Sequence, residues 1–130
     1  MKAGPNAARM TPDTGKQSFA SIAAEELQMR IAASGLTESM ARMAFELCVD
    51  EVPVEEAFQR IQESAIEKMV RMLDSSILND EGALQSCLET VTAESERLAW
   101  QALEKGTEDL RDGLAMLENV RKLEGNGYLN

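Results

Sequence analysis

The sequence predicts an all-α protein, a helical bundle built on a long antiparallel helix hairpin with shorter flanking helices. Two observations carry this prediction. Residues with high helix propensity dominate the chain, and runs of β-branched residues are absent. Apolar residues also recur in steps of three and four, the spacing that places them on one face of a helix. With 130 residues, the chain is long enough for one modest core that needs neither metal nor disulfide.

The two ends of the chain lack this periodicity. Residues 1–16 contain two prolines and two glycines without an apolar period, so we expect a disordered N-terminal tail. Residues 17–124 should form a single helical domain, and residues 125–130 should form a short C-terminal tail.

Two short helices should open the domain. The first is expected over about 17–34, with Gly35 in the left-handed conformation that commonly closes a helix. The hydroxyl of Thr37 is suited to cap the second helix, which should run to about Asp50. Because both helices are short, they need packing against the rest of the domain to persist.

The hairpin should follow. Pro53 fits the first turn of a helix, where its missing N–H costs nothing, and an apolar stripe predicts that this helix continues to residue 77 or 78. Asn79 is a suitable cap for the second long helix. Because so short a junction joins two long helices, we expect them to pack antiparallel, over about 53–78 and 80–105.

Gly106 decides how the second long helix ends. One interpretation is a break or kink at Gly106, with Thr107 as the cap of a last helix that ends near Leu123. The other is a continuous helix that tolerates Gly106 at a cost of about 1 kcal/mol relative to Ala. We favour the break, because the apolar seam of this helix ends at Ala102 and does not continue in register onto Leu110, Leu114 and Leu117. The seam consists of Leu84, Leu88, Val91, Ser95, Leu98 and Ala102, which follow each other in steps of four and three.

A wide apolar surface in the first long helix raises the question of oligomeric state. A second stripe, formed by Ile66, Val70, Leu73 and Ile77, joins the first one there, so this surface needs neighbours on two sides. The short helices could cover it in a monomer, or two hairpins could pair in a homodimer with a four-helix core. We favour the homodimer, because the helices are long and the surface is wide.

Composition argues against several kinds of function. The chain has no histidine, which removes the common catalytic triads and most zinc sites, and it has no glycine-rich phosphate loop. We therefore expect no enzymatic activity, no cofactor and no metal. The net charge of −10 opposes direct binding to nucleic acid or to an anionic membrane. No apolar run is long enough to span a bilayer, so we expect a cytoplasmic protein without membrane contact.

The two cysteines point to the same compartment. Cys48 and Cys87 lie beside apolar residues within expected helices, without CxxC spacing. We interpret both as small, reduced core residues of a cytoplasmic protein, with a disulfide between them as the alternative.

Methionine and tryptophan residues are candidates for binding a partner. The Met40–Met43 and Met69–Met72 pairs would line a groove if exposed, because flexible thioethers adapt to varied partners, or they would fill the core. Trp100 lies beside the apolar stripe of its helix and would cover a neighbouring helix or anchor an interface. The interface candidates are Met40, Met43, Met69, Met72, Leu84, Leu88, Val91, Leu98, Trp100 and Ala102.

These features predict a non-enzymatic helical module for protein–protein interaction. Such an adaptor, chaperone or regulatory protein would offer an apolar helical groove to an amphipathic helix of another protein. The alternative is an acidic decoy that inhibits a nucleic-acid-binding protein by occupying its basic surface. A decoy needs a contiguous acidic stripe, whereas an adaptor needs an exposed apolar groove. Acidic residues are interleaved with Lys and Arg on most of the expected helices, which favours the adaptor.

Overall fold

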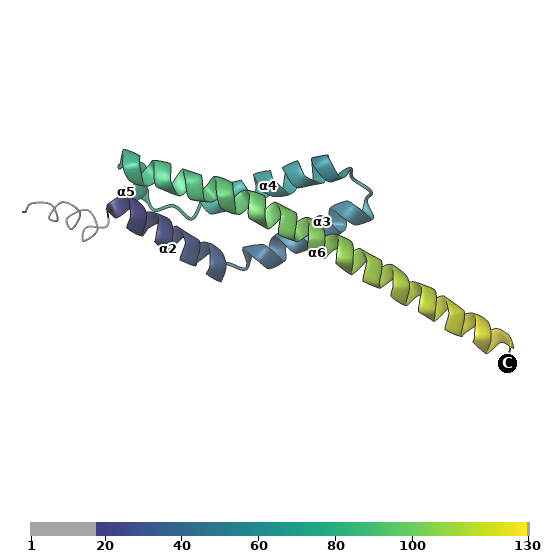
Figure 1. Cartoon of the computed structure of the whole chain (residues 1–130). Coiled ribbons are helices and arrows are strands. Elements are labelled where there is room, and N and C mark those ends of the chain that lie inside the picture. Colours follow the sequence, from purple (N-terminus) through teal and green to yellow (C-terminus); the bar gives the residue numbers. More distant parts are fainter. Residues whose placement is uncertain (1–17, 130) are drawn as a thin grey trace, which may run out of the picture. The chain divides into compact units, whose positions relative to one another are not determined.

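The computed structural model describes residues 18–129, and side chains up to residue 124. All regular structure in this range is helical, which confirms the all-α class. The helices are α2 (Phe19–Ala33), α3 (Leu36–Val49), α4 (Val54–Val70), α5 (Ser75–Leu78) and α6 (Glu81–Leu129) (Figure 1). α4 and α6 run antiparallel, as the predicted hairpin requires. The N-terminal tail expected over 1–16 lies outside the described residues.

Contacts along the chain define two compact units, and α4 and α6 contribute residues to both. Unit 1 contains α2, the last turns of α4 from Ile66, α5, and α6 up to Ser95. Unit 2 contains α3 from Thr37, the first part of α4 up to Ala65, and α6 from Glu96 onward. The expectation of a single domain stays a prediction.

The ends of the first two helices follow local capping rules. Ser18 caps α2, since its hydroxyl accepts a 3.3 Å hydrogen bond from an amide in the first turn. Gly35 has a φ of 78°, the predicted left-handed conformation after α2. The prediction that Thr37 caps the next helix is wrong, because α3 already begins at Leu36, whose amide donates to the Ser34 hydroxyl at 3.1 Å.

The helix expected over 53–78 is interrupted. α4 ends at Val70, and the single turn of α5 begins only after Asp74. The Arg30 guanidinium holds the intervening turn, because it donates to the carbonyl oxygen of Met72 at 2.8 Å and to both carboxylate oxygens of Asp74 at 3.1 Å. Arg30 thus supplies a donor to a carbonyl group at the point where the chain leaves the helix, and it ties α2 to this turn.

α6 begins one residue later than predicted. Asp80 is its capping residue, and its carboxylate accepts a 2.9 Å hydrogen bond from the amide of Ala83. The predicted cap, Asn79, instead follows α5 as its C-terminal cap.

The predicted break at Gly106 is wrong, because α6 continues through it to Leu129. Within unit 2, the α3 backbone passes where a side chain at Gly106 would lie. An ideal Cβ there would be 2.9 Å from the amide nitrogen of Phe45 and 3.0 Å from the carbonyl carbon of Ala44. This close approach offsets the cost of about 1 kcal/mol that glycine carries in a helix. The helix end expected near Leu123 is likewise replaced by continuous helix.

The buried face of α6 is shifted by one residue at its start. The predicted seam placed Leu84 and Leu88 inside, but the structure buries Ala83 and Cys87 and leaves Leu88 43% exposed. Small residues on the buried face allow close helix packing. From Val91 onward, the predicted seam and the buried face agree.

Candidate functional site

The structure separates the interface candidates by burial. Met40, Met69, Val91, Leu98 and Ala102 are buried within the chain. Met43, Met72, Leu84, Leu88 and Trp100 are partly or largely exposed. Each methionine pair thus has one buried member, and the two pairs belong to different units. Of these exposed candidates, Trp100 borders a groove in unit 2.

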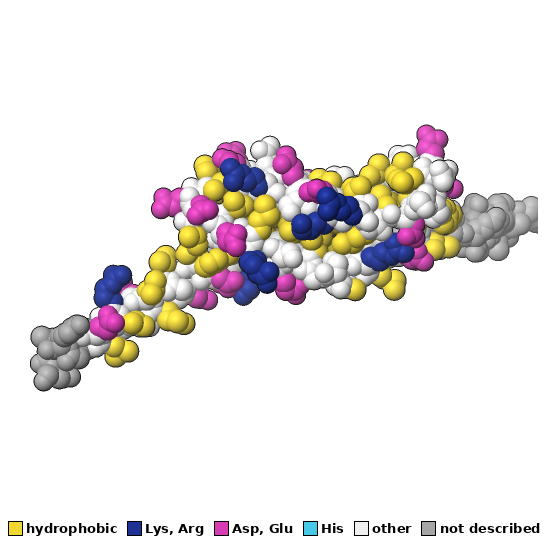
Figure 2. Space-filling model, turned by 180° about the vertical axis from the view of Figure 1, so that it is seen from behind, with side chains coloured by type: hydrophobic (Ala, Val, Ile, Leu, Met, Phe, Trp, Pro, Cys, Tyr) yellow, Lys and Arg dark blue, Asp and Glu magenta, His cyan; other side chains and the backbone are white. Residues whose placement is uncertain are grey.

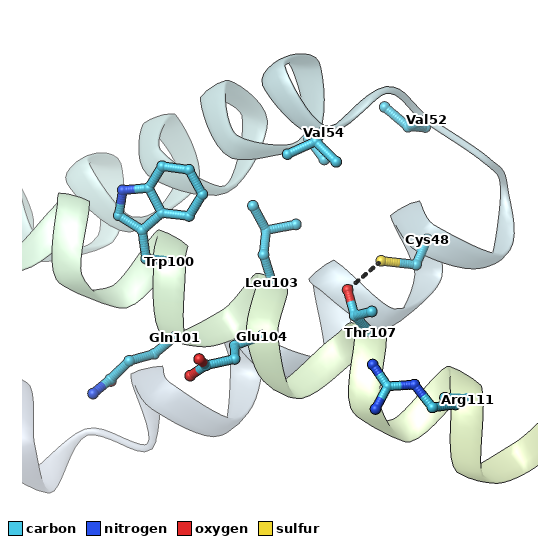
Figure 3. A pocket seen from close by; sticks show the side chains of 10 residues that line it. Cys48, Val52, Val54, Trp100, Gln101, Leu103, Glu104, Thr107 and Arg111 are labelled. Carbon is cyan, nitrogen blue, oxygen red and sulfur yellow. Dashed lines mark hydrogen bonds between the residues drawn. The ribbon is translucent and has the colours of Figure 1, made fainter.

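A groove of about 450 Å³ opens beside Trp100 in unit 2 (Figure 3). α6 contributes one side of it, through Trp100, Gln101, Leu103, Glu104, Thr107 and Arg111. The end of α3, the following turn and the first turn of α4 contribute Cys48, Val52, Val54 and Ala57. In Figure 3 the Leu103 side chain points toward Val54, so both sides of the groove present apolar groups.

The groove residues of α6 share one helix face because of their spacing. Trp100, Leu103, Thr107 and Arg111 follow each other in steps of three and four, which brings them above one another along a helix. α6 is continuous here, so these side chains have a rigid support. A helix break at Gly106 would have divided this face, and the continuity of α6 at this residue keeps it intact.

Trp100 is held in place although it is 59% exposed. Its indole packs against the ring of Phe58 on α4, with ring centroids 4.6 Å apart and planes tilted by 45°. A second hollow of about 870 Å³ lies on the α4 side, and Trp100 and Val54 border both hollows. A large apolar side chain is therefore presented at the surface while it packs against Phe58.

The turn between α3 and α4 positions the opposite side of the groove. Glu51 adopts a left-handed conformation with φ of 60°. The amide of Val52 donates to the carbonyl of Leu47, and the amide of Glu51 donates to that of Cys48, both at 3.0 Å. This is the hydrogen-bond pattern of a Schellman helix ending, in which glycine is the usual residue. The sequence offers no glycine as a signal at this turn, so this wall of the groove escaped sequence reasoning.

The two cysteines have different surroundings. Both are free thiols. Cys87 is a core residue of unit 1, as predicted, and burial raises the pKa of its thiol. Cys48 is only partly buried; it lines the groove, with its sulfur 3.8 Å from the hydroxyl oxygen of Thr107. The expectation of a core position is thus met by Cys87 alone.

Charged side chains are dispersed over the surface. In Figure 2, acidic side chains stand among hydrophobic and basic ones and form no continuous stripe on the face shown. Several acids pair with a base four residues away on the same helix: Glu56 with Arg60, Glu67 with Arg71 and Asp109 with Lys105. Such pairs are typical of solvated helix faces.

The described residues also limit the chemistry. Within them, His, Cys, Asp and Glu side chains form no group of three or more that could hold a metal ion. None of the helices between residues 18 and 129 combines the length and apolar character that crossing a membrane requires. The groove therefore offers apolar contact with a polar rim.

Fold and groove together define an all-α protein built on an antiparallel helix pair. Comparison with family models, with curated proteins and with solved structures finds no match to this chain.

Proposed function

We propose that the protein is a non-enzymatic protein–protein interaction module that binds an amphipathic helix of another protein in the groove beside Trp100. The observation that carries this proposal is the exposed indole of Trp100 between two hollows. Tryptophan is enriched among the few residues that dominate binding energy in interfaces. An adaptor, a chaperone and a regulatory protein would all use such a surface, and we place this role in the cytoplasm, where free thiols persist.

The shape and chemistry of the groove favour a helix as occupant. A helix presents apolar side chains every three or four residues, and such anchors match a groove that runs along α6 from Trp100 toward Arg111. Contact with Phe58 already restricts the indole, so binding costs little additional side-chain entropy.

The rim gives the partner helix a preferred direction. Glu104 and Arg111 carry opposite charges and lie two turns apart on the same side of the groove. A partner helix with a basic residue near Glu104 and an acidic residue near Arg111 would be favoured over the reverse direction. Rim charges chiefly influence orientation and association rate, whereas the apolar contact supplies most of the affinity.

The acidic-decoy alternative has less support. A decoy requires closely spaced acids on one surface, and on the face shown in Figure 2 the acids stand among basic and apolar side chains. The groove, by contrast, is an apolar hollow next to the chain's only tryptophan.

Affinity capture from the native cell tests the proposal with a matched pair of variants. Trp100→Ala should lose the captured partner, with affinity reduced by a factor of about 30 or more, since truncation of a central aromatic anchor typically costs at least ~2 kcal/mol. Met29→Ala serves as the control, because Met29 is 70% exposed on α2 of unit 1 and remote in sequence from the groove. Capture should persist at high salt; a partner lost at high salt but retained by Trp100→Ala would support the decoy instead.

Fluorescence then tests whether the contact is direct. Because Trp100 is the chain's only tryptophan, its emission reports on the groove alone. Addition of the captured partner's helical segment should shift this emission to shorter wavelength as the indole leaves water. Binding that leaves the emission unchanged would contradict the proposed site.

A further inference from the structure

From residue 111 to residue 124, α6 presents a second surface that no part of the described chain covers. We infer that residues 108–124 pair antiparallel with the same segment of a second copy of the chain. This association differs from the interaction in the groove, since it joins two identical copies and not the protein to a different partner, and the two surfaces share Arg111 at the end of the groove.

The segment is strongly amphipathic and exposed. Every residue from 111 to 124 is exposed, and α6 extends beyond α3 and α4 of unit 2 (Figure 1). Its large apolar residues are Leu110, Leu114, Met116, Leu117, Val120 and Leu123. At about 100° per residue they occupy roughly half of the helix circumference. Figure 2 shows hydrophobic side chains along the projecting helix, and an exposed face of this kind marks an interaction surface.

Gly113 provides an independent indication of a close neighbour. It lies seven residues after Gly106, and therefore on the same face of α6. A Cβ at Gly106 would collide with α3, but a Cβ at Gly113 would meet no described atom within 4 Å. Glycine in a helix is unfavourable unless a close approach requires it. At Gly106 the close neighbour is α3. We therefore expect another helix to approach Gly113 equally closely.

The charges of the segment identify that helix as a second copy. In an antiparallel pair centred on the segment, Leu114 of one copy meets Leu117 of the second copy. The same register places Arg111 beside Glu118 of the second copy, and two-fold symmetry makes this ion pair twice. Gly113 then faces Val120 of the second copy, where the missing Cβ leaves room.

The distribution of charge along the segment favours the antiparallel over the parallel arrangement. Residues 108–116 hold Glu108, Asp109 and Asp112 against Arg111, a net charge of −2, and residues 117–124 hold Arg121 and Lys122 against Glu118 and Glu124, a net charge of zero. Antiparallel pairing places the acidic half of each copy beside the neutral half of the other, whereas parallel pairing would place the two acidic halves side by side. It also keeps the folded parts of the two acidic chains at opposite ends of the paired segment, which limits their repulsion.

Sedimentation equilibrium of the full chain over a range of concentrations tests the association. The mass should rise from 14.3 kDa toward twice that value, and Leu117→Asp should raise the dissociation constant at least about tenfold by placing a charge in the apolar contact. Leu78→Asp is the matched control, since Leu78 is a similarly exposed leucine on α5, and should leave the mass unchanged. A chain that stays monomeric up to about 1 mM, or a dimer that survives Leu117→Asp, would overturn the inference.

A charge exchange tests the register and identity of the occupant. Arg111→Glu and Glu118→Arg should each weaken the dimer about tenfold, because each places like charges opposite each other at two symmetric contacts. The double variant restores opposite charges and should return the dissociation constant to the original range. Both positions are exposed, so the variants keep the fold, which circular dichroism verifies. A double variant weaker than either single variant would overturn the antiparallel pairing.

Discussion

α6 behaves differently on the two sides of residue 110. From 96 to 110, its apolar face packs within unit 2 and buries Leu98 and Ala102. From 111 to 124, an equally apolar face is exposed throughout. The spacing of apolar residues is alike in the two stretches, so periodicity alone does not separate a core seam from a docking surface. What separates them is whether α3 and α4 are long enough to cover the face.

The largest expected effect is a contrast between two leucines. Leu98→Ala should lower the free energy of unfolding by about 2–5 kcal/mol, because Leu98 is 1% exposed and its truncation leaves a cavity. Leu117→Ala should change it by less than ~0.5 kcal/mol, because Leu117 is 59% exposed. Urea unfolding at low chain concentration, followed by circular dichroism, measures both. Equal losses would show that residues 111–124 pack within the chain.

Two glycines should respond to alanine with opposite signs. Gly106→Ala introduces a Cβ against the backbone of Phe45 and Ala44 and should destabilise the chain by about 1–2 kcal/mol, since overpacking outweighs the gain in helix propensity. Gly113→Ala meets open space and should stabilise the monomer by about 0.5–1 kcal/mol. Thermal unfolding at low chain concentration distinguishes them.

The same pair of variants separates folding from association. In the dimer proposed above, Gly113→Ala should weaken self-association while stabilising the monomer. If alanine at Gly106 stabilised the chain as well, α3 would not approach α6 closely, and the contrast between the two stretches would disappear.

Sequence reasoning recovered the class and the main elements because these depend on local signals. Helix propensity and apolar spacing indicated an all-α hairpin, and Gly35 marked the first turn. Trp100 is also a candidate anchor in the sequence, because its position beside the apolar stripe can be read from the spacing within a single helix; the structure leaves it 59% exposed.

The errors arose where a distant contact decides local structure. Arg30 on α2 donates hydrogen bonds to Met72 and Asp74 where the chain leaves α4. The residues near the end of α4 in sequence give no signal of these hydrogen bonds. In the sequence, Gly106 looks like a residue that ends a helix. The structure shows that glycine is needed there because the α3 backbone approaches closely. The groove needed Phe58 and the turn at Glu51, which lie far from Trp100 in sequence.

The smallest effect concerns an ion pair at the boundary between the two stretches. Lys105 and Asp109 lie 3.0 Å apart, and the hydrogen bond to Asp109 raises the pKa of the Lys105 ammonium. Because the pKa of Lys105 is higher in the folded state, the ion pair contributes stability that is fully present below the unfolded-state pKa. This stability is lost as the pH rises through the folded-state pKa. Asp109→Asn should therefore lower the melting temperature slightly at pH 7 and not at all above the pKa of Lys105.

Solvent exposure and ionic strength set the size of this difference in melting temperature. Both side chains are largely exposed, so the difference should shrink as ionic strength rises. Glu118→Gln, in the uncovered stretch, is the control and should show no alkaline dependence at low chain concentration. A melting-temperature difference that grows with pH would contradict the pairing.

Photo-crosslinking at position 100 tests the central claim most directly. A benzophenone amino acid in place of Trp100 keeps an aromatic group at the edge of the groove, and irradiation in the native cell joins it to whatever lies within contact. The proposed interaction predicts crosslinks to an amphipathic helical segment of a different protein, with none at position 29 under the same conditions. Crosslinks at position 100 no more frequent than at position 29, or formed only with a second copy of this chain, would contradict it.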